Sequence, residues 1–213
     1  MKFLVVFFMI LKVKRQMVMT SSKENLMPKF TSTFQPLIDQ EGYLVNQDDL
    51  SCREVVGKAL AILRTSKDNE KSKKDAKEIW DLSLPEELSM TTNSDGVQCL
   101  WISPDEFWLL HSQQQKADIW NKIESLPIEM SMVDNSAAYG VLEFIGEKVN
   151  ELLSRWMSYD LSGSLNSGKV VSTTLGQAPV IIFRTLEGKL MMMVRHSFSH
   201  YVAGLLKDSA KRV

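Results

Sequence analysis

The stretch Leu100-Trp-Ile-Ser-Pro-Asp-Glu-Phe-Trp-Leu-Leu110 decides how this chain folds. Residues 97–102 and 107–111 are rich in the aromatic and branched side chains that strands favour. The four residues between them, Ser-Pro-Asp-Glu at 103–106, suit a tight turn because proline presets φ at the second position. These segments therefore predict a β-hairpin.

A helix is predicted directly after this hairpin. Ser112 and Gln115 have the spacing of a capping box, in which each residue satisfies a free amide of the other. The apolar residues that follow recur at helical spacing, and they are Ile119, Trp120 and Ile123.

The same order of elements recurs near the C-terminus. Residues 179–184 predict a strand, residues 185–188 a turn and residues 190–195 the next strand. Ser197 is expected to cap a helix with one apolar stripe, formed by Phe198, Tyr201, Val202, Leu205 and Leu206.

Each hairpin is preceded by a strand and a helix. In the first half these are residues 58–64 and a helix near Ala76, inside the charge-dense stretch 67–78, which predicts a solvated loop and an exposed helix face. In the second half they are residues 140–145 and a helix from Glu147, whose apolar stripe is Val149, Leu152, Leu153, Trp156 and Met157.

The sequence therefore predicts an α+β fold made of two similar strand–helix–strand–strand–helix halves. The domain spans residues 34–208, and its two pseudo-repeats cover about 50–127 and 128–208. Residues 1–33 form an irregular lead-in.

Composition excludes several classes of protein. The 213 residues are 44% hydrophobic and 24% charged, which excludes a disordered chain, a collagen-like repeat and a disulfide scaffold. The 25 basic and 26 acidic residues nearly cancel, so no nucleic-acid binding is predicted. Cys52 and Cys99 lack zinc-ligand spacing. They favour free thiols in a reducing cytoplasm, with pairing in an oxidising compartment as the alternative.

An apolar run at residues 3–11 needs its own interpretation. In a helix it would rise only about 14 Å, too short to cross a hydrocarbon core, so no membrane partner is predicted. The preferred interpretation is a mis-set translation start, with the real one at Met17 or Met19. An export signal and a surface-associated tail are the alternatives.

The candidate motifs each favour a structural interpretation. Gly163-Ser-Leu-Asn-Ser-Gly-Lys169 matches most of a P-loop, but Val170 replaces the magnesium-binding hydroxyl, and a helix precedes where a strand is required. His196 and His200 are four residues apart without a third ligand, so His200 is expected to be a partly exposed helix residue. Asp134 and Asp160 are predicted to serve capping and turn hydrogen bonds. The Met191–Met193 run is expected in the core or a contact surface.

Several segments resemble the gamma subunit of heterotetrameric sarcosine oxidase, over about Phe34 to Leu206. The strongest is the hairpin 100–110, which looks like that family's Pro-Asp-Glu-Trp-Leu-Leu hairpin. The others are Val133-Asp-Asn-Ser136, Leu142-Glu-Phe-Ile-Gly146, Tyr159-Asp-Leu161, residues 174–184 and Val194-Arg-His-Ser-Phe-Ser199. Departures are Asn135, usually aliphatic in the family, and Ala137-Ala138.

The resemblance implies a fold similar to the folate-binding domain of the glycine-cleavage aminomethyltransferase. It also implies a cytoplasmic complex that demethylates sarcosine oxidatively, giving glycine, hydrogen peroxide and a methylene group for tetrahydrofolate. The partners would be alpha, beta and delta subunits, which carry FAD, FMN, NAD, tetrahydrofolate and zinc. In this chain the resemblance places no catalytic, cofactor-binding or metal-binding residue, so we expect a structural subunit.

Two alternatives remain from other classes of protein. One is a stand-alone folate-binding or aminomethyltransferase-like protein. The other is a membrane-associated or exported protein led by residues 3–11. The sequence does not indicate which N-methyl amine the complex would use.

Overall fold

The computed structural model describes residues 32–66 and 69–213, and residues Ser32–Val213 form one compact unit. The predictions about the apolar run 3–11, the start at Met17 or Met19 and most of the lead-in 1–33 lie outside the described residues. No described helix is both long and apolar enough to span a bilayer.

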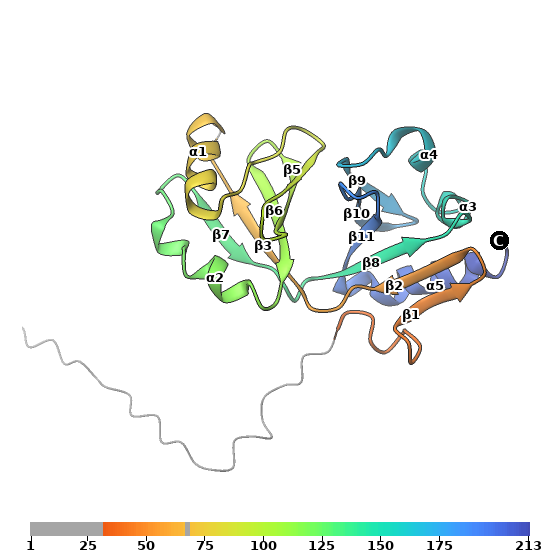
Figure 1. The fold of residues 1–213 in the computed structure, drawn as a ribbon. Coiled ribbons are helices and arrows are strands. Elements are labelled where there is room, and N and C mark those ends of the chain that lie inside the picture. The colour runs from red at the N-terminus through yellow and green to blue at the C-terminus, as the bar shows by residue number, and fades with distance from the viewer. Residues whose placement is uncertain (1–31, 67–68) are drawn as a thin grey trace, which may run out of the picture. The chain divides into compact units, whose positions relative to one another are not determined.

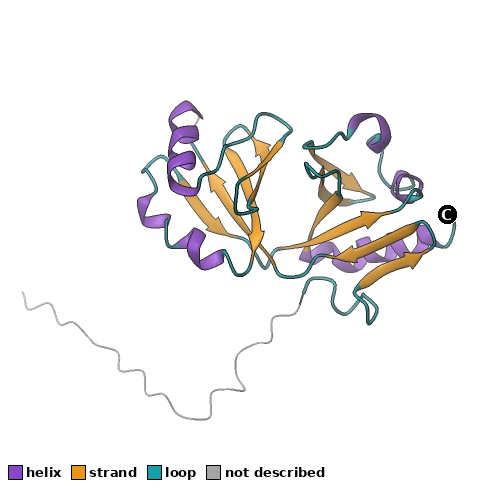
Figure 2. Cartoon of the chain, in the orientation of Figure 1, coloured by secondary structure: helices purple, strands orange, loops and turns teal. Residues whose placement is uncertain are grey.

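Two antiparallel sheets and several helices make up the described unit, which confirms the α+β class (Figures 1 and 2). The six-stranded sheet has the order β1 (Tyr43–Gln47), β2 (Leu50–Glu54), β8 (Tyr139–Ile145), β11 (Leu190–Arg195), β10 (Ala178–Arg184) and β9 (Val170–Leu175). The five-stranded sheet has the order β4 (Met90–Thr92), β5 (Gln98–Ser103), β6 (Glu106–Ser112), β3 (Lys58–Arg64) and β7 (Ser131–Asp134).

The helices follow the predicted order along the chain. They are α1 (Asn69–Trp80), α2 (Lys116–Trp120), α3 (Val149–Ser154), α4 (Leu161–Ser164) and α5 (Ser199–Ala210), with 3-10 turns at Ile123–Ser125 and His196–Phe198. In α1, Ala76 and Trp80 are buried while most of the charged side chains are exposed, as the charge-dense stretch predicts.

The two pseudo-repeats exchange their leading strands. Read from one edge, the five-stranded sheet runs β4-β5-β6-β3-β7, and the other sheet runs β9-β10-β11-β8-β2-β1. In this order β4, β5, β6 and β3 correspond to β9, β10, β11 and β8. The next strand in each sheet comes from the other repeat: β7 pairs with β3, and β2 pairs with β8. Both connections, β2 to β3 and β7 to β8, cross from one sheet to the other.

Both predicted hairpins form. β5 and β6 are joined through Pro104 and Asp105, with Ser103 paired to Glu106. β10 and β11 are joined by the turn 185–188, where Gly188 has a φ of +88° that glycine adopts without strain. Neither hairpin contains an edge strand of its sheet.

Three of the predicted helix details are wrong. α2 is only five residues long, and Ile123 lies in a separate 3-10 turn. α3 ends at Ser154, so Trp156 leaves the buried stripe and its side chain is 41% exposed. α5 begins at Ser199 behind a 3-10 turn, so Ser197 does not cap it.

The apolar side chains form three clusters. One lies between the six-stranded sheet and α3 and α5, and a second lies between the five-stranded sheet and α1 and α2. The third contains residues of both sheets, including Leu60, Trp108 and Leu110 from one and Phe183 and Met193 from the other. The Met191–Met193 run is buried, so it belongs to the core.

Candidate functional site

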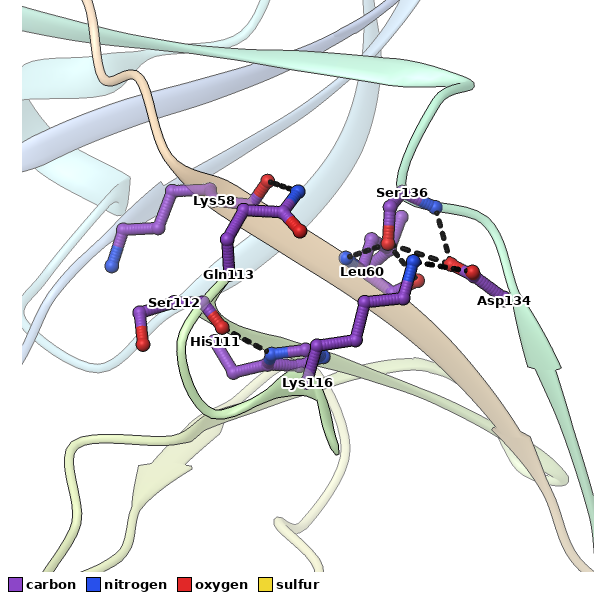
Figure 3. Close-up of polar contacts among 8 residues, drawn as sticks. All are labelled: Lys58, Leu60, His111, Ser112, Gln113, Lys116, Asp134 and Ser136. Carbon is purple, nitrogen blue, oxygen red and sulfur yellow. Dashed lines mark hydrogen bonds and ion pairs between the residues drawn. The ribbon is translucent and has the colours of Figure 1, made fainter. Parts of the chain in front are cut away.

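A polar cluster lies where the β7–β8 connection passes β3 and α2 (Figure 3). The backbone N–H of Leu60 donates to Ser136 Oγ at 3.1 Å, and the N–H of Asn135 donates to the Leu60 carbonyl at 2.9 Å. Ser136 Oγ donates to Asp134 Oδ1 at 2.6 Å, and Asp134 Oδ2 pairs with Lys116 Nζ at 2.6 Å. The cluster therefore fastens the second crossing connection to β3 and α2.

Gln113 fastens the first crossing connection from the same side. Its N–H donates to the Gly57 carbonyl at 2.8 Å, and its Nε2 donates to the Lys58 carbonyl at 3.0 Å. The Lys58 ammonium group points away from the cluster (Figure 3). Burial lowers the pKa of Lys58, and the charge of Lys189 lowers it further.

His111 lies beneath these contacts and is fully buried. Its Nδ1 is 2.8 Å from the Ser112 carbonyl, and because a carbonyl only accepts, Nδ1 carries the ring proton. Its Nε2 has no hydrogen-bond partner among the described residues. Burial lowers the pKa of His111, and the charges of Lys116 and Lys58 add to that effect. The imidazole is therefore neutral near pH 7.

Ser136, His111 and Asp134 are the residue types of a nucleophilic triad, but they are not connected as one. A catalytic serine needs its hydroxyl within reach of the base, and the base must be oriented by the acid. Here Ser136 Oγ donates to Asp134, and His111 Nδ1 binds a backbone carbonyl. The connectivity suits a structural contact rather than acyl transfer.

Both aspartates have the predicted turn and capping roles. Asp160 Oδ1 accepts from the N–H groups of Ser162 and Gly163 at 3.0 and 3.1 Å, at the start of α4. Burial alone would raise the pKa of Asp134, but the hydrogen bonds from Lys116 and Ser136 outweigh it and lower the pKa. Asp134 is therefore ionised across the neutral range.

The P-loop-like run at 163–169 joins the edges of the two sheets. Its first two residues belong to α4, and β9 follows it. The order of helix before strand was predicted, and it is the reverse of the phosphate-binding order. Gly168 has a φ of +79°, an isolated antiparallel bridge pairs Ser89 with Lys169, and the Val170 N–H donates to the Leu88 carbonyl at 2.8 Å. The glycine here shapes a junction between β4 and β9.

The remaining candidate residues lie apart from the polar cluster. His196 and His200 are both exposed, and the described ranges 32–66 and 69–213 hold no group of three residues arranged to bind a metal. Cys52 in β2 and Cys99 in β5 are free and fully buried. Burial raises the pKa of both thiols, which keeps them protonated.

Sequence reasoning singled out Asp134 as a turn or capping residue, but it did not single out His111 or place either residue together with Ser136 and Lys116. The spacing Asp134-Asn-Ser136 is typical of an Asx turn, and the Ser136 N–H does donate to Asp134 Oδ1 at 3.1 Å. The approach of Lys116 depends on β7 lying beside β3, a pairing between the two repeats. No local pattern carries that information.

Comparisons with known proteins agree on one family. A family model described as "Sarcosine oxidase, gamma subunit family" matches residues 73–212. A sarcosine oxidase subunit gamma from Corynebacterium sp. (strain P-1) is 27% identical over 130 residues, which is 59% of this chain and 63% of that relative. The match therefore spans less than two thirds of the relative's length.

Two solved structures share the fold. A chain of heterotetrameric sarcosine oxidase from Corynebacterium sp. U-96, crystallised with pyrrole 2-carboxylate, has a TM-score of 0.72 at 21% identity, covering 86% of this chain and 95% of that one. The glycine cleavage system aminomethyltransferase T from Bartonella henselae has a TM-score of 0.53 at 11% identity, covering 72% of this chain and 44% of that one.

These matches confirm the resemblance found in the sequence, including the implied similarity of fold to the aminomethyltransferase. The family model covers well over half of the residues and includes the β5–β6, β9–β10 and β10–β11 hairpins. The chain belongs to the sarcosine oxidase gamma subunit family.

Proposed function

We propose that this chain is a non-catalytic structural subunit of a multi-subunit complex of the sarcosine oxidase type. The observation that carries the proposal is the family match over residues 73–212. A subunit of this kind contributes binding surface and rigidity to an assembly whose chemistry takes place on other chains.

The polar cluster supports a structural role. The groups that would have to act in catalysis are engaged in holding the second crossing connection, β7 to β8. Ser136 binds Asp134 and Leu60, and Asp134 binds Lys116. His111 Nε2 is buried, so a substrate has no access to it in this conformation. The cluster therefore stabilises the exchange of strands between the repeats.

The reaction of the proposed complex is the oxidative demethylation of sarcosine. The N-methyl group loses two electrons, which reduce O₂ to hydrogen peroxide, and its carbon passes as a methylene group to tetrahydrofolate, leaving glycine. FAD, FMN, NAD, tetrahydrofolate and zinc would be held by the alpha, beta and delta subunits. We place the complex in the cytoplasm.

Co-purification tests the proposal. The full chain, carrying an affinity tag, is produced with and without candidate alpha, beta and delta subunits and analysed by size-exclusion chromatography with absorbance at flavin wavelengths. We expect it to co-elute with a flavin-containing chain and with sarcosine-dependent peroxide production only when the partners are present. A lone chain that is yellow and produces peroxide would contradict the structural role.

A second measurement distinguishes the structural subunit from the alternative, a stand-alone folate-binding protein. A ligand that binds only the folded state raises the thermal midpoint. We expect tetrahydrofolate to leave the midpoint of the lone chain unchanged. A saturable rise in the midpoint, together with failure to co-elute with any partner, would favour the alternative over the structural subunit.

A further inference from the structure

A cavity lies in the first repeat, and none of its lining residues belongs to the polar cluster. It has a volume of about 370 Å³ and opens between the end of α1, the turn 93–97 and α2. Its floor is apolar and consists of Trp80, Val97, Leu109 and Ile119. The volume lies in the range of pockets that hold small ligands or a single large side chain.

Two carboxylates stand at the rim of this cavity. Asp95 lies in the turn 93–97 and Asp118 lies in α2, and both are exposed. Within residues 32–66 and 69–213, no cation forms an ion pair with either of them. Lys122 also lines the cavity, so the two carboxylates and one ammonium group leave a net charge of −1.

Hydrogen bonds within the chain fix the walls of the cavity in the absence of a ligand. Asn93 Oδ1 accepts from the N–H groups of Asp95 and Val97 at 3.0 and 2.9 Å, which fixes the turn. Gln115 Nε2 donates to the Asp95 carbonyl at 2.6 Å, and Gln115 Oε1 accepts from Ser112, which fixes the turn to the start of α2. A preformed pocket of this kind loses little conformational freedom on binding.

We infer that this cavity, defined by the floor and the two rim carboxylates, receives an arginine or lysine side chain of a partner subunit. An apolar floor below carboxylates matches the chemistry of such a side chain, whose methylene stem packs on apolar surface while its charged head stays at the rim. Arginine anchors in central pockets are frequent sources of binding energy at interfaces. The inference rests on the proposed function, because it assigns a contact to that assembly.

The first test uses the full chain alone, so it does not depend on any partner. Uniformly ¹⁵N-labelled chain is titrated with N-acetyl-arginine methylamide and, separately, with N-acetyl-citrulline methylamide, which has the same shape without the charge. We expect saturable shifts of the Trp80 indole and Val97 amide signals with the arginine probe only. Equal shifts with both probes, or none with either, would overturn the inference.

Two variants test whether the arginine-dependent shifts require the carboxylates at the rim of the cavity. Asp95→Asn with Asp118→Asn removes both carboxylates with little change of shape, and Glu124→Gln removes one exposed charge just beyond α2 as a matched control. The double variant should lose the arginine-dependent shifts, and Glu124→Gln should keep them. Retained shifts in the double variant would place the binding elsewhere and refute the cavity.

The second test uses the co-expressed complex. The double variant should bind its partners at least about tenfold more weakly than the parent and Glu124→Gln, with a smaller loss of affinity as salt rises. Unchanged affinity of the double variant would refute the contact while leaving the structural subunit intact. If the parent chain binds no partner at all, the proposed function fails, and the titration of the lone chain still decides whether the cavity takes a cationic side chain.

Discussion

Gly146 follows β8 directly and has a conformation that other residues adopt only with strain. Its φ is +122°, and a Cβ atom added there would overlap the carbonyl of Asp49 in the β1–β2 turn. That carbonyl also accepts the N–H of Lys148 at 3.2 Å. The close approach holds the outer hairpin of the six-stranded sheet against the start of α3.

Replacing Gly146 with alanine should therefore destabilise the protein by roughly 1–3 kcal/mol or more, because strain is added to a backbone clash. Gly204→Ala is the control, since Gly204 lies on the exposed side of α5 with open space around it. That change should stabilise the protein by about 0.5–1 kcal/mol. Urea unfolding of both variants measures the difference, and equal stabilities would show that the approach to Asp49 is unimportant.

His111 gives a prediction about pH. Its pKa is lowered in the folded state, mainly by burial, so the unfolded chain binds its proton more readily. The contribution of neutral His111 is therefore fully present above about pH 6.5, the unfolded value, and is lost as pH falls below it. Acid should thus destabilise the parent more than a variant without this group.

Chemical denaturation of the parent and of His111→Gln at pH 7.5 and pH 5.5 checks this sign. His111 is the only residue that differs between the two proteins, so the comparison reports this side chain alone. The parent should lose more stability between the two pH values than His111→Gln does. Equal losses would mean that His111 does not contribute to acid sensitivity.

At the scale of single elements, Ser136 makes the side-chain contact that joins the β7–β8 connection to β3, beside the backbone bond from Asn135. Ser136→Ala leaves the buried Leu60 N–H without its acceptor, which should cost about 1–3 kcal/mol. Ser94→Ala removes an exposed hydroxyl that donates to Asp81 and should cost less than about 0.5 kcal/mol. Thermal denaturation compares the two. A Ser136→Ala midpoint equal to that of Ser94→Ala would show that the connection is held without this bond.

The elements also show which features the sequence could predict. Both hairpins were predictable because a short turn and its flanking strands are local in sequence. The C-terminal end of α3 was not predictable, because the helical spacing of apolar residues from Val149 to Met157 continues beyond Ser154, where tertiary contacts end the helix. The Trp156 carbonyl accepts from the Gly176 N–H at 2.7 Å, and its indole N–H donates to Ser209 Oγ at 2.8 Å. These partners lie 20 and 53 residues away.

The candidate cluster was predictable only in part for the same reason. Asp134 stood out by residue type, and Ser112 with Gln115 does form the predicted reciprocal hydrogen bonds. That box lies just before α2 rather than capping it directly. The meeting of Asp134 with Lys116 depends on which strand β7 pairs with. Apolar periodicity predicts that a segment forms a strand, but it does not predict which other strand that segment pairs with.

At the scale of the whole molecule, the described unit should unfold in one step. The third apolar cluster contains residues from both sheets, and each repeat supplies a strand to the sheet of the other. Calorimetry should therefore give one transition whose van't Hoff and calorimetric enthalpies agree. Two separated transitions would show that the sheets are independent.

Phe183→Ala provides the matched test of that coupling. Phe183 is fully buried in the shared cluster, so its loss should cost about 3–5 kcal/mol and shift the single transition as a whole. Ile128→Ala, at a side chain that is 98% exposed, should leave the transition within about 0.5 kcal/mol of the parent. A variant of Phe183 that splits the transition would contradict a common core.

The two repeats exchange β2 and β7, so a single polypeptide has the strand pairing that a domain-swapped dimer has between two chains. Each repeat is both donor and acceptor of an arm, and the segment around Ile128 is the tether that links the two. Cutting that tether would leave two fragments that still hold each other by β2 on β8 and β7 on β3. The tether therefore contributes effective concentration, because it makes the pairing of β2 with β8 and of β7 with β3 an intramolecular, first-order reaction.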